Sequence, residues 1–391
     1  MPVRRVKEER LLKKLSKRGR SNLLNALVII ITLGIVLYLS AQGGDLGKAW
    51  EAVMNADLFW IGMALVSWLV FMIFEGMGLY IFLLQQKQKV RFTSSFIVAM
   101  IGSFYSAVTP AATGGQPMQV FAYKKRGVPT GFSSSGLAVK FFTFQTALLT
   151  MGGLLWLFNG DPIGLGVETK VWATTGFILN GFTVAVVLLL AINKNIVRWI
   201  ITLCIKLGKA IRLVKNEAKL ASKVDAAMED FHASVHMITH HPLKLLWLLF
   251  HACLNVLGLM SISYFIYRAL GLNEHSYLDI LTRQFLLYIS ASFTPLPGAS
   301  GAQEGGFFLF FKGVFPDEMG VGPMLLWRFF TYYFTLITGF IAVLLDSTYH
   351  MRQRKKAGAV ETVNIEKGAE GIASENSEAS GSADASAESD Q

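Results

Sequence analysis

The chain has 391 residues, of which 53% are hydrophobic and 16% are charged, and it carries a formal net charge of +10. Soluble domains average about 25% charged residues, and several runs here exceed the roughly 18 apolar residues that can span a bilayer. This composition excludes an ordinary soluble domain and predicts an all-α polytopic membrane protein. The basic surplus is typical of cytoplasmic loops beside anionic lipid. We predict no nucleic-acid partner, because no basic stretch is interleaved with stacking aromatic residues.

The N-terminal segment, residues 1–21, is strongly basic, with nine basic and two acidic side chains among its first 20 residues. This excess predicts a cytoplasmic N-terminus. The apolar run that follows is about 19 residues long, which is too long for the hydrophobic region of a signal peptide, so we predict an uncleaved first span. Apolar runs predict about six full spans in all: Leu23–Ala41, Leu58–Leu84, Ser133–Phe158, Val171–Ile192, Leu243–Tyr267 and Pro323–Asp346.

Two further apolar segments are broken by proline and glycine, at residues 92–123 and 277–315. The first lies between basic loops and the second between acidic or mixed loops, so each is predicted to enter and leave the membrane on one face. Both are therefore predicted to be re-entrant helical hairpins that point at each other. Residues 22–192 and 243–346 would form an inverted repeat, as in secondary transporters. The alternative is that proline and glycine only kink ordinary spans.

Two segments fall outside this membrane core. Residues 193–242 mix apolar and basic side chains and are predicted to form a cytoplasmic connector with an amphipathic surface helix. Residues 347–391 form a cytoplasmic tail, which beyond Lys356 holds eight acids and one lysine. With almost no large apolar residues, that tail cannot bury enough surface to fold and is predicted to be disordered.

The two breaks have similar sequences, "TPAATGGQP" from Thr109 to Pro117 and "TPLPGASGAQEGG" from Thr294 to Gly306. Exposed backbone N–H groups at the start of a half-helix suit a phosphate or carboxylate, and glycine permits close approach of the backbone. We therefore predict that the tips hold a small polar headgroup. The polar residues of the predicted path are Thr109, Gln116, Thr294 and Gln303, and the residues that shape the backbone are Pro110, Gly114, Gly115, Pro295, Pro297, Gly298 and Gly301.

Ionisable side chains inside spans are costly and often functional. Glu304 follows the second break, where it either caps free N–H groups or contacts the headgroup; as a headgroup contact it would be needed for transport but not for folding. Arg283 and Arg328 either join the path or reach the outer interface, and Lys140 either joins it or reaches inward. Glu75 either pairs with Lys140 or is protonated. Tyr332, in the last predicted span, completes the predicted substrate path.

No enzyme signature is present in the sequence, and we predict no catalytic residue and no cofactor. His232, His236 and His240 recur every four residues, a spacing that can bind a metal on one helix face. No carboxylate or cysteine completes a tight site there, so we predict no metal.

Three stretches resemble one known family: "TPAATGGQPMQVFAYKKRGVP" from Thr109, "TPLPGASGAQEG" from Thr294 and "LLWRFFTYYFTLITGF" from Leu325. They are similar to the integral-membrane, flippase-like region of lysylphosphatidylglycerol synthases, over roughly residues 21–346. The resemblance implies a flippase of the bacterial plasma membrane that moves a phospholipid, such as aminoacylated phosphatidylglycerol, between leaflets.

The same resemblance leaves an alternative open. Family members can carry a cytosolic synthase domain, which has no counterpart in this sequence. The chain could then be a membrane subunit that docks a separate synthase or transferase; a lysyltransferase acting alone is disfavoured. Two positions depart from the family pattern: members often have Glu where this chain has Gln116, and Arg where it has Gln303.

Overall fold

The computed structural model describes residues 53–160, 164–192 and 240–349, together with the single positions 47, 51, 199 and 233. This part of the chain is helical and contains no strand, which confirms the predicted all-α class. Several predictions lie outside the described residues. These are the basic segment 1–21, the span Leu23–Ala41, nearly all of the connector 193–242, His232 and His236, and the tail beyond residue 349.

Among the described residues, five helices are long and apolar enough to cross a membrane, and they correspond to the other five predicted spans. The fifth contains three parts, a helix α13, a π-helical turn η4 and a continuing helix. The bounds are α3 (Leu58–Gln85), α6 (Thr130–Asn159), α7 (Val167–Ile192), α10 (Pro242–Ala269) and the helix Gly322–Tyr349, within which α13 is Gly322–Arg328 and η4 is Phe329–Tyr333.

Polar side chains and small residues join these helices where their backbones approach closely. On α10, a Cβ at Gly258 would lie 2.7 Å from the backbone nitrogen of Phe71 on α3. Ser67 Oγ donates to the carbonyl of Gly258 (2.7 Å), and Asn255 Nδ2 donates to the carbonyl of Phe71 (2.8 Å). Small residues with interhelical hydrogen bonds are how helices associate in lipid, where no hydrophobic force drives them together.

The two broken segments form helix–break–helix units at the predicted places. The first consists of α4 (Phe92–Val108), a short turn η1 (Pro110–Ala112) and α5 (Gly115–Lys125). The second consists of α11 (Tyr277–Ala291), a short turn η2 (Pro297–Ala299) and α12 (Ala302–Phe310). Each half is shorter than the roughly 20 residues of a full crossing, and the tips touch: the backbone N–H of Ala111 donates to the carbonyl of Pro295 (3.1 Å).

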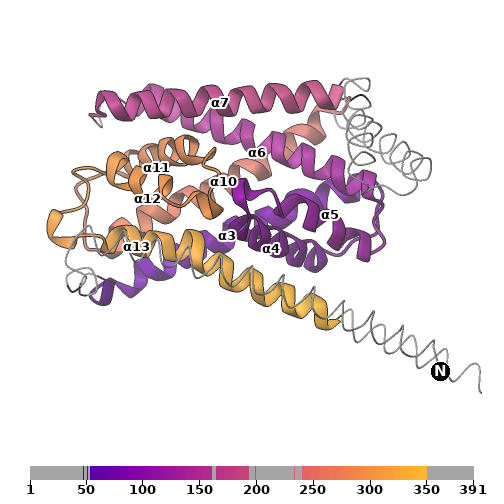
Figure 1. The fold of residues 1–391 in the computed structure, drawn as a ribbon, viewed down its shortest axis with the longest axis horizontal. Coiled ribbons are helices and arrows are strands. Elements are labelled where there is room, and N and C mark those ends of the chain that lie inside the picture. The colour runs from indigo at the N-terminus through magenta and orange to yellow at the C-terminus, as the bar shows by residue number, and fades with distance from the viewer. Residues whose placement is uncertain are drawn as a thin grey trace, which may run out of the picture. The chain divides into compact units, whose positions relative to one another are not determined.

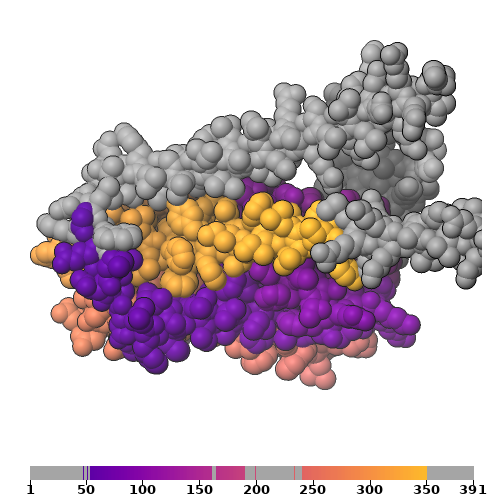
Figure 2. All heavy atoms as spheres, turned by 90° about the horizontal axis from the view of Figure 1, so that it is seen from below, coloured from indigo at the N-terminus to yellow at the C-terminus, as the bar shows by residue number. Residues whose placement is uncertain are grey.

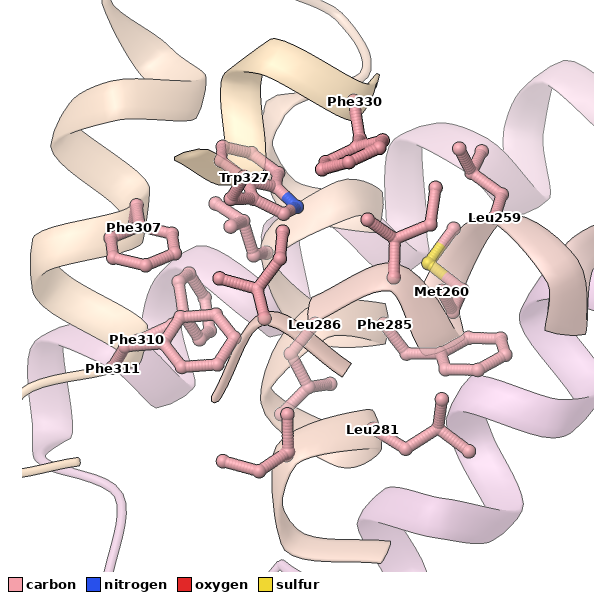
Figure 3. Packing of buried hydrophobic residues seen from close by; sticks show 14 of the residues in the cluster. Leu259, Met260, Leu281, Phe285, Leu286, Phe307, Phe310, Phe311, Trp327 and Phe330 are labelled. Atoms are coloured by element: carbon pink, nitrogen blue, oxygen red, sulfur yellow. The ribbon is translucent and has the colours of Figure 1, made fainter. Parts of the chain in front are cut away.

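An aromatic cluster anchors the second broken segment. Phe307 of α12 stacks on Phe311 and on Trp327 of α13, with ring centroids 4.7 Å and 5.3 Å apart. Phe285 and Leu286 of α11 are fully buried in the same hydrophobic core (Figure 3). Trp68 of α3 donates from Nε1 to Thr335 Oγ1 of the last helix (2.8 Å). Figure 2 shows the indigo and purple surface of the first described helices beside the orange surface of the second half of the chain.

Helix α7 lies across α6 and α11 (Figure 1) and is joined to the second hairpin by a buried amide. Asn180 Nδ2 donates to the carbonyl of Ile289 (3.1 Å) and to Ser292 Oγ (3.0 Å), both near the end of α11. Its Oδ1 accepts from Gln145 Nε2 of α6 (2.7 Å). Asn180 therefore bonds one backbone carbonyl and one side-chain hydroxyl at the end of α11.

We expect Asn180→Ala to lower the free energy of unfolding by about 1–2 kcal/mol, near the upper end of measured interhelical hydrogen bonds in membranes. The control is Thr175→Ala on the same helix, because Thr175 is exposed and bonds only to its own helix at the carbonyl of Val171; its effect should stay within about 0.5 kcal/mol. Reversible unfolding in mixed micelles, followed by circular dichroism, measures both. Equal effects of the two variants would contradict the role of Asn180.

Candidate functional site

A cavity of about 430 Å³ lies where the two hairpin tips meet. Residues of α3, α4, α6, α11, both tips and the last helix line it, so segments far apart in the sequence share one wall. Seven residues of the predicted path are among the lining: Glu75, Gln116, Lys140, Thr294, Gln303, Arg328 and Tyr332. Gly298, predicted to shape the backbone of the second tip, lines the cavity as well.

The first tip is held by Thr109. Its Oγ1 donates to the carbonyl of Tyr105 (2.6 Å) and accepts from the backbone N–H of Gly114 (2.8 Å), which joins the end of α4 to the start of α5. Ala111 and Ala112 have positive φ values of 50° and 54°, a conformation that costs about 1–2 kcal/mol for a residue with a Cβ. Strain of this kind, held in place by surrounding contacts, gathers at functional sites.

The second tip packs under Tyr332. At Gly298, φ is +61°, and a Cβ there would lie 2.2 Å from Cε2 of the Tyr332 ring. The hydroxyl of Tyr332 in turn donates to the carbonyl of Ala107, at the end of α4 (3.2 Å). Tyr332 therefore contacts both hairpins at once. It lies in the π-helical turn η4, and such turns are frequent at functional sites.

Glu304 and Arg328 form a buried ion pair behind the second tip. Arg328 donates to Glu304 Oε1 from Nε (2.7 Å) and Nη2 (2.6 Å), and also from Nη2 to the carbonyl of Gly298 (3.1 Å). Glu304 Oε2 accepts from the backbone N–H of Gly301 (2.6 Å) at the start of α12. The capping alternative for Glu304 is thus confirmed. The alternative that Arg328 reaches the outer interface is wrong, because only 4% of the residue is exposed.

A second ion pair joins α3 to α6. Lys140 Nζ contacts Glu75 Oε1, and each side chain is 17% exposed. The predicted pairing of Glu75 with Lys140 is therefore present, and both residues line the cavity. Lys140 does not reach inward along its helix, since its amine is held by the acid on α3.

Comparison with known proteins covers the part of the chain that forms this site. Residues 24–339, which hold both broken segments and the whole cavity lining, match the family described as the lysylphosphatidylglycerol synthase TM region. The chain belongs to this family. A UPF0104 membrane protein of Archaeoglobus fulgidus is 25% identical over 273 residues, which cover 65% of this chain and 76% of that protein. The predicted family is confirmed.

Not every predicted path residue of this family member faces the cavity. Arg283 is 7% exposed, and its Nη1 donates to the carbonyl of Phe310 at the end of α12 (2.7 Å), where a cation complements the helix terminus. Glu304 supports Arg328 from behind rather than forming part of the wall. The structure likewise places Thr109, Pro110, Gly114, Gly115, Pro295, Pro297 and Gly301 in the tips but not among the lining residues.

Two lining residues that sequence reasoning missed have a polar atom without a hydrogen-bond partner, namely Gln284 at Oε1 and Trp327 at Nε1. Oε1 of the predicted Gln303 has no partner either. Tyr288, one turn after Gln284 on α11, also lines the wall. A glutamine in a broken apolar segment was the available signal for Gln284. No feature of the sequence indicated Trp327, because a tryptophan among other aromatic residues is usually a packing residue.

Proposed function

We propose that this protein moves a phospholipid between the two leaflets of a membrane. The headgroup would occupy the cavity at the hairpin tips, and the acyl chains would remain in the surrounding lipid. The family description names lysylphosphatidylglycerol, which suggests an aminoacylated phosphatidylglycerol as one candidate substrate. The proposal includes a bacterial plasma membrane with both termini in the cytoplasm, as the basic loops favour.

The observation that carries the proposal is a cavity lined by charged side chains inside a helical bundle that exposes many large hydrophobic residues. At about 430 Å³ the cavity falls within the range of small-ligand sites, roughly 300–1,000 Å³. Lys140 and Arg328 would contact a phosphate, and Glu75 would contact a cationic group. The broken helices support the same reading, because transporters place their substrate sites where such helices meet near the midplane.

Leaflet exchange in proteoliposomes tests the proposal. Purified protein is reconstituted with labelled phosphatidylglycerol or with its lysyl derivative, the outer label is quenched, and the protected fraction is followed. Protein-dependent loss of protection is the expected result. No exchange of any phospholipid by folded, inserted protein would overturn the proposal and favour the docking-subunit alternative. That alternative predicts a soluble enzyme that co-purifies and is lost when the residues after Lys356 are deleted.

Filling the cavity should stop exchange. Ser103 of α4 lines the cavity, and we expect Ser103→Trp to slow exchange at least about tenfold, equivalent to about 1.4 kcal/mol of barrier. Thr93→Trp is the matched control, because Thr93 lies on the same helix, is exposed and is absent from the lining. Unchanged exchange in a folded Ser103→Trp protein would place the lipid route elsewhere.

A further inference from the structure

The charges of the cavity cancel. Among the described residues that line it, the side chains charged at neutral pH are Glu75, Lys140 and Arg328. Glu75 pairs with Lys140, and Arg328 pairs with Glu304 directly behind it. Gln116 and Gln303, which also line the cavity, are neutral amides. The wall together with Glu304 directly behind it therefore contains two ion pairs and has no net charge.

Such a wall constrains the charge of a headgroup that binds in the cavity. An ionic group in a low-dielectric site is tolerated when it is paired and is strongly disfavoured when it is not. A headgroup with one phosphate and one ammonium can exchange partners with the Glu75–Lys140 pair: its phosphate contacts Lys140 and its ammonium contacts Glu75. The number of unpaired charges then stays at zero. A headgroup with a net charge leaves one charge without a partner.

The unpartnered polar atoms of the wall fit the same kind of ligand. Gln284 Oε1 and Gln303 Oε1 are buried acceptors, and Trp327 Nε1 is a buried donor, none of which has a hydrogen-bond partner. The three residues are 2%, 7% and 2% exposed. A buried polar atom left without a partner is destabilising. An ammonium would donate to the two amide oxygens, and a phosphate oxygen would accept from the indole.

We propose that the cavity selects phospholipids whose headgroup carries one phosphate and one ammonium and has no net charge. The inference rests on the proposed transport function and names its substrate class. It ranks an overall neutral headgroup above phosphatidylglycerol, which carries a net negative charge. It also ranks that headgroup above the lysyl derivative of phosphatidylglycerol, whose two amines outweigh its phosphate.

Three probe lipids test the ranking: phosphatidylethanolamine, phosphatidylglycerol and lysylphosphatidylglycerol. We expect exchange of phosphatidylethanolamine to be at least about tenfold faster than exchange of either other lipid, because an unpaired charge in a buried site is strongly disfavoured relative to a paired one. Equal or faster exchange of a charged lipid overturns the inference and leaves the transport function standing. If no lipid is exchanged, the transport function fails. The binding order of the three lipids on detergent-solubilised protein, measured by native mass spectrometry, then decides the inference separately.

Variants that change the charge of the cavity should alter the order in which the three lipids are exchanged and bound, and opposite charge changes should alter it in opposite directions. Glu75→Gln leaves the cavity with a net positive charge and should raise phosphatidylglycerol above phosphatidylethanolamine in both exchange and binding. Lys140→Gln leaves a net negative charge and should raise the lysyl lipid instead. A purely structural defect would slow all three lipids together and leave their order unchanged, which would overturn the inference. Glu168→Gln, which removes an exposed acid at the start of α7 outside the cavity lining, is the matched control.

Discussion

Glu304→Gln is expected to lower the free energy of unfolding by about 3–5 kcal/mol, the usual effect of removing one partner of a buried ion pair. The variant leaves the guanidinium of Arg328 with no carboxylate in a position where only 4% of the residue is exposed. It also replaces a charged cap at the N–H of Gly301 by a neutral one. Reversible unfolding in mixed micelles, with leaflet exchange measured on the same preparation, gives both readouts.

Two further variants distinguish the loss of the Glu304–Arg328 pair from a general effect of removing an acidic side chain on stability. Glu304→Gln combined with Arg328→Met removes both charges, so the double variant should be more stable than Glu304→Gln alone. Glu318→Gln removes an exposed acid in the loop before α13 and should change stability by no more than about 0.5 kcal/mol. If Glu304→Gln abolishes exchange at wild-type stability, Glu304 acts on the headgroup alone, as the sequence argument for a ligand contact supposed.

Gly298→Ala is expected to lower the free energy of unfolding by about 2–4 kcal/mol, from backbone strain and overpacking together. The backbone has φ +61° at this position, and the added Cβ would lie 2.2 Å from the Tyr332 ring. The ring is rigid and its hydroxyl is bonded to the carbonyl of Ala107, so relief requires one hairpin to move against the other. Exchange should fall with stability, because this contact joins the two tips.

Gly305→Ala is the control for that substitution. Gly305 lies inside α12, and a Cβ there meets nothing within 4 Å; alanine should be neutral or stabilise the helix by up to about 1 kcal/mol. In a Tyr332→Ala background, Gly298→Ala should lose its packing penalty and keep only its backbone strain. A full-sized effect of Gly298→Ala without the Tyr332 ring would assign the whole cost to the backbone.

The location of the helices could be predicted from the sequence because hydropathy and chain breaks are local properties. Five predicted spans and both broken segments are present, with ends displaced by a few residues: α6 begins at Thr130 rather than Ser133, and α12 ends at Phe310 rather than at residue 315. Helix ends depend on single capping contacts, which hydropathy does not register. Asp57, whose side chain accepts from the N–H of Phe59, begins α3 in this way.

The site residues were predicted by type, and their roles depended on contacts between distant segments. Arg283 and Arg328 have similar apolar surroundings in the sequence, yet one caps the end of α12 and the other lines the cavity. Glu304 caps the N–H of Gly301, which was one of its two alternatives, and it also pairs with Arg328 one helix further on. Gln284 gained significance only when α11 placed it in the wall.

By itself, the sequence determined the membrane class, the family, five of the spans and the two breaks, because apolar run length, proline, glycine and short motifs act locally along the chain. Only the tertiary structure decided that the tips touch at Ala111 and Pro295, that Glu75 pairs with Lys140 and Glu304 with Arg328, and that the cavity charges cancel. The reason is physical: the cost of an ionic group inside a membrane protein depends on which opposite charge the fold brings beside it.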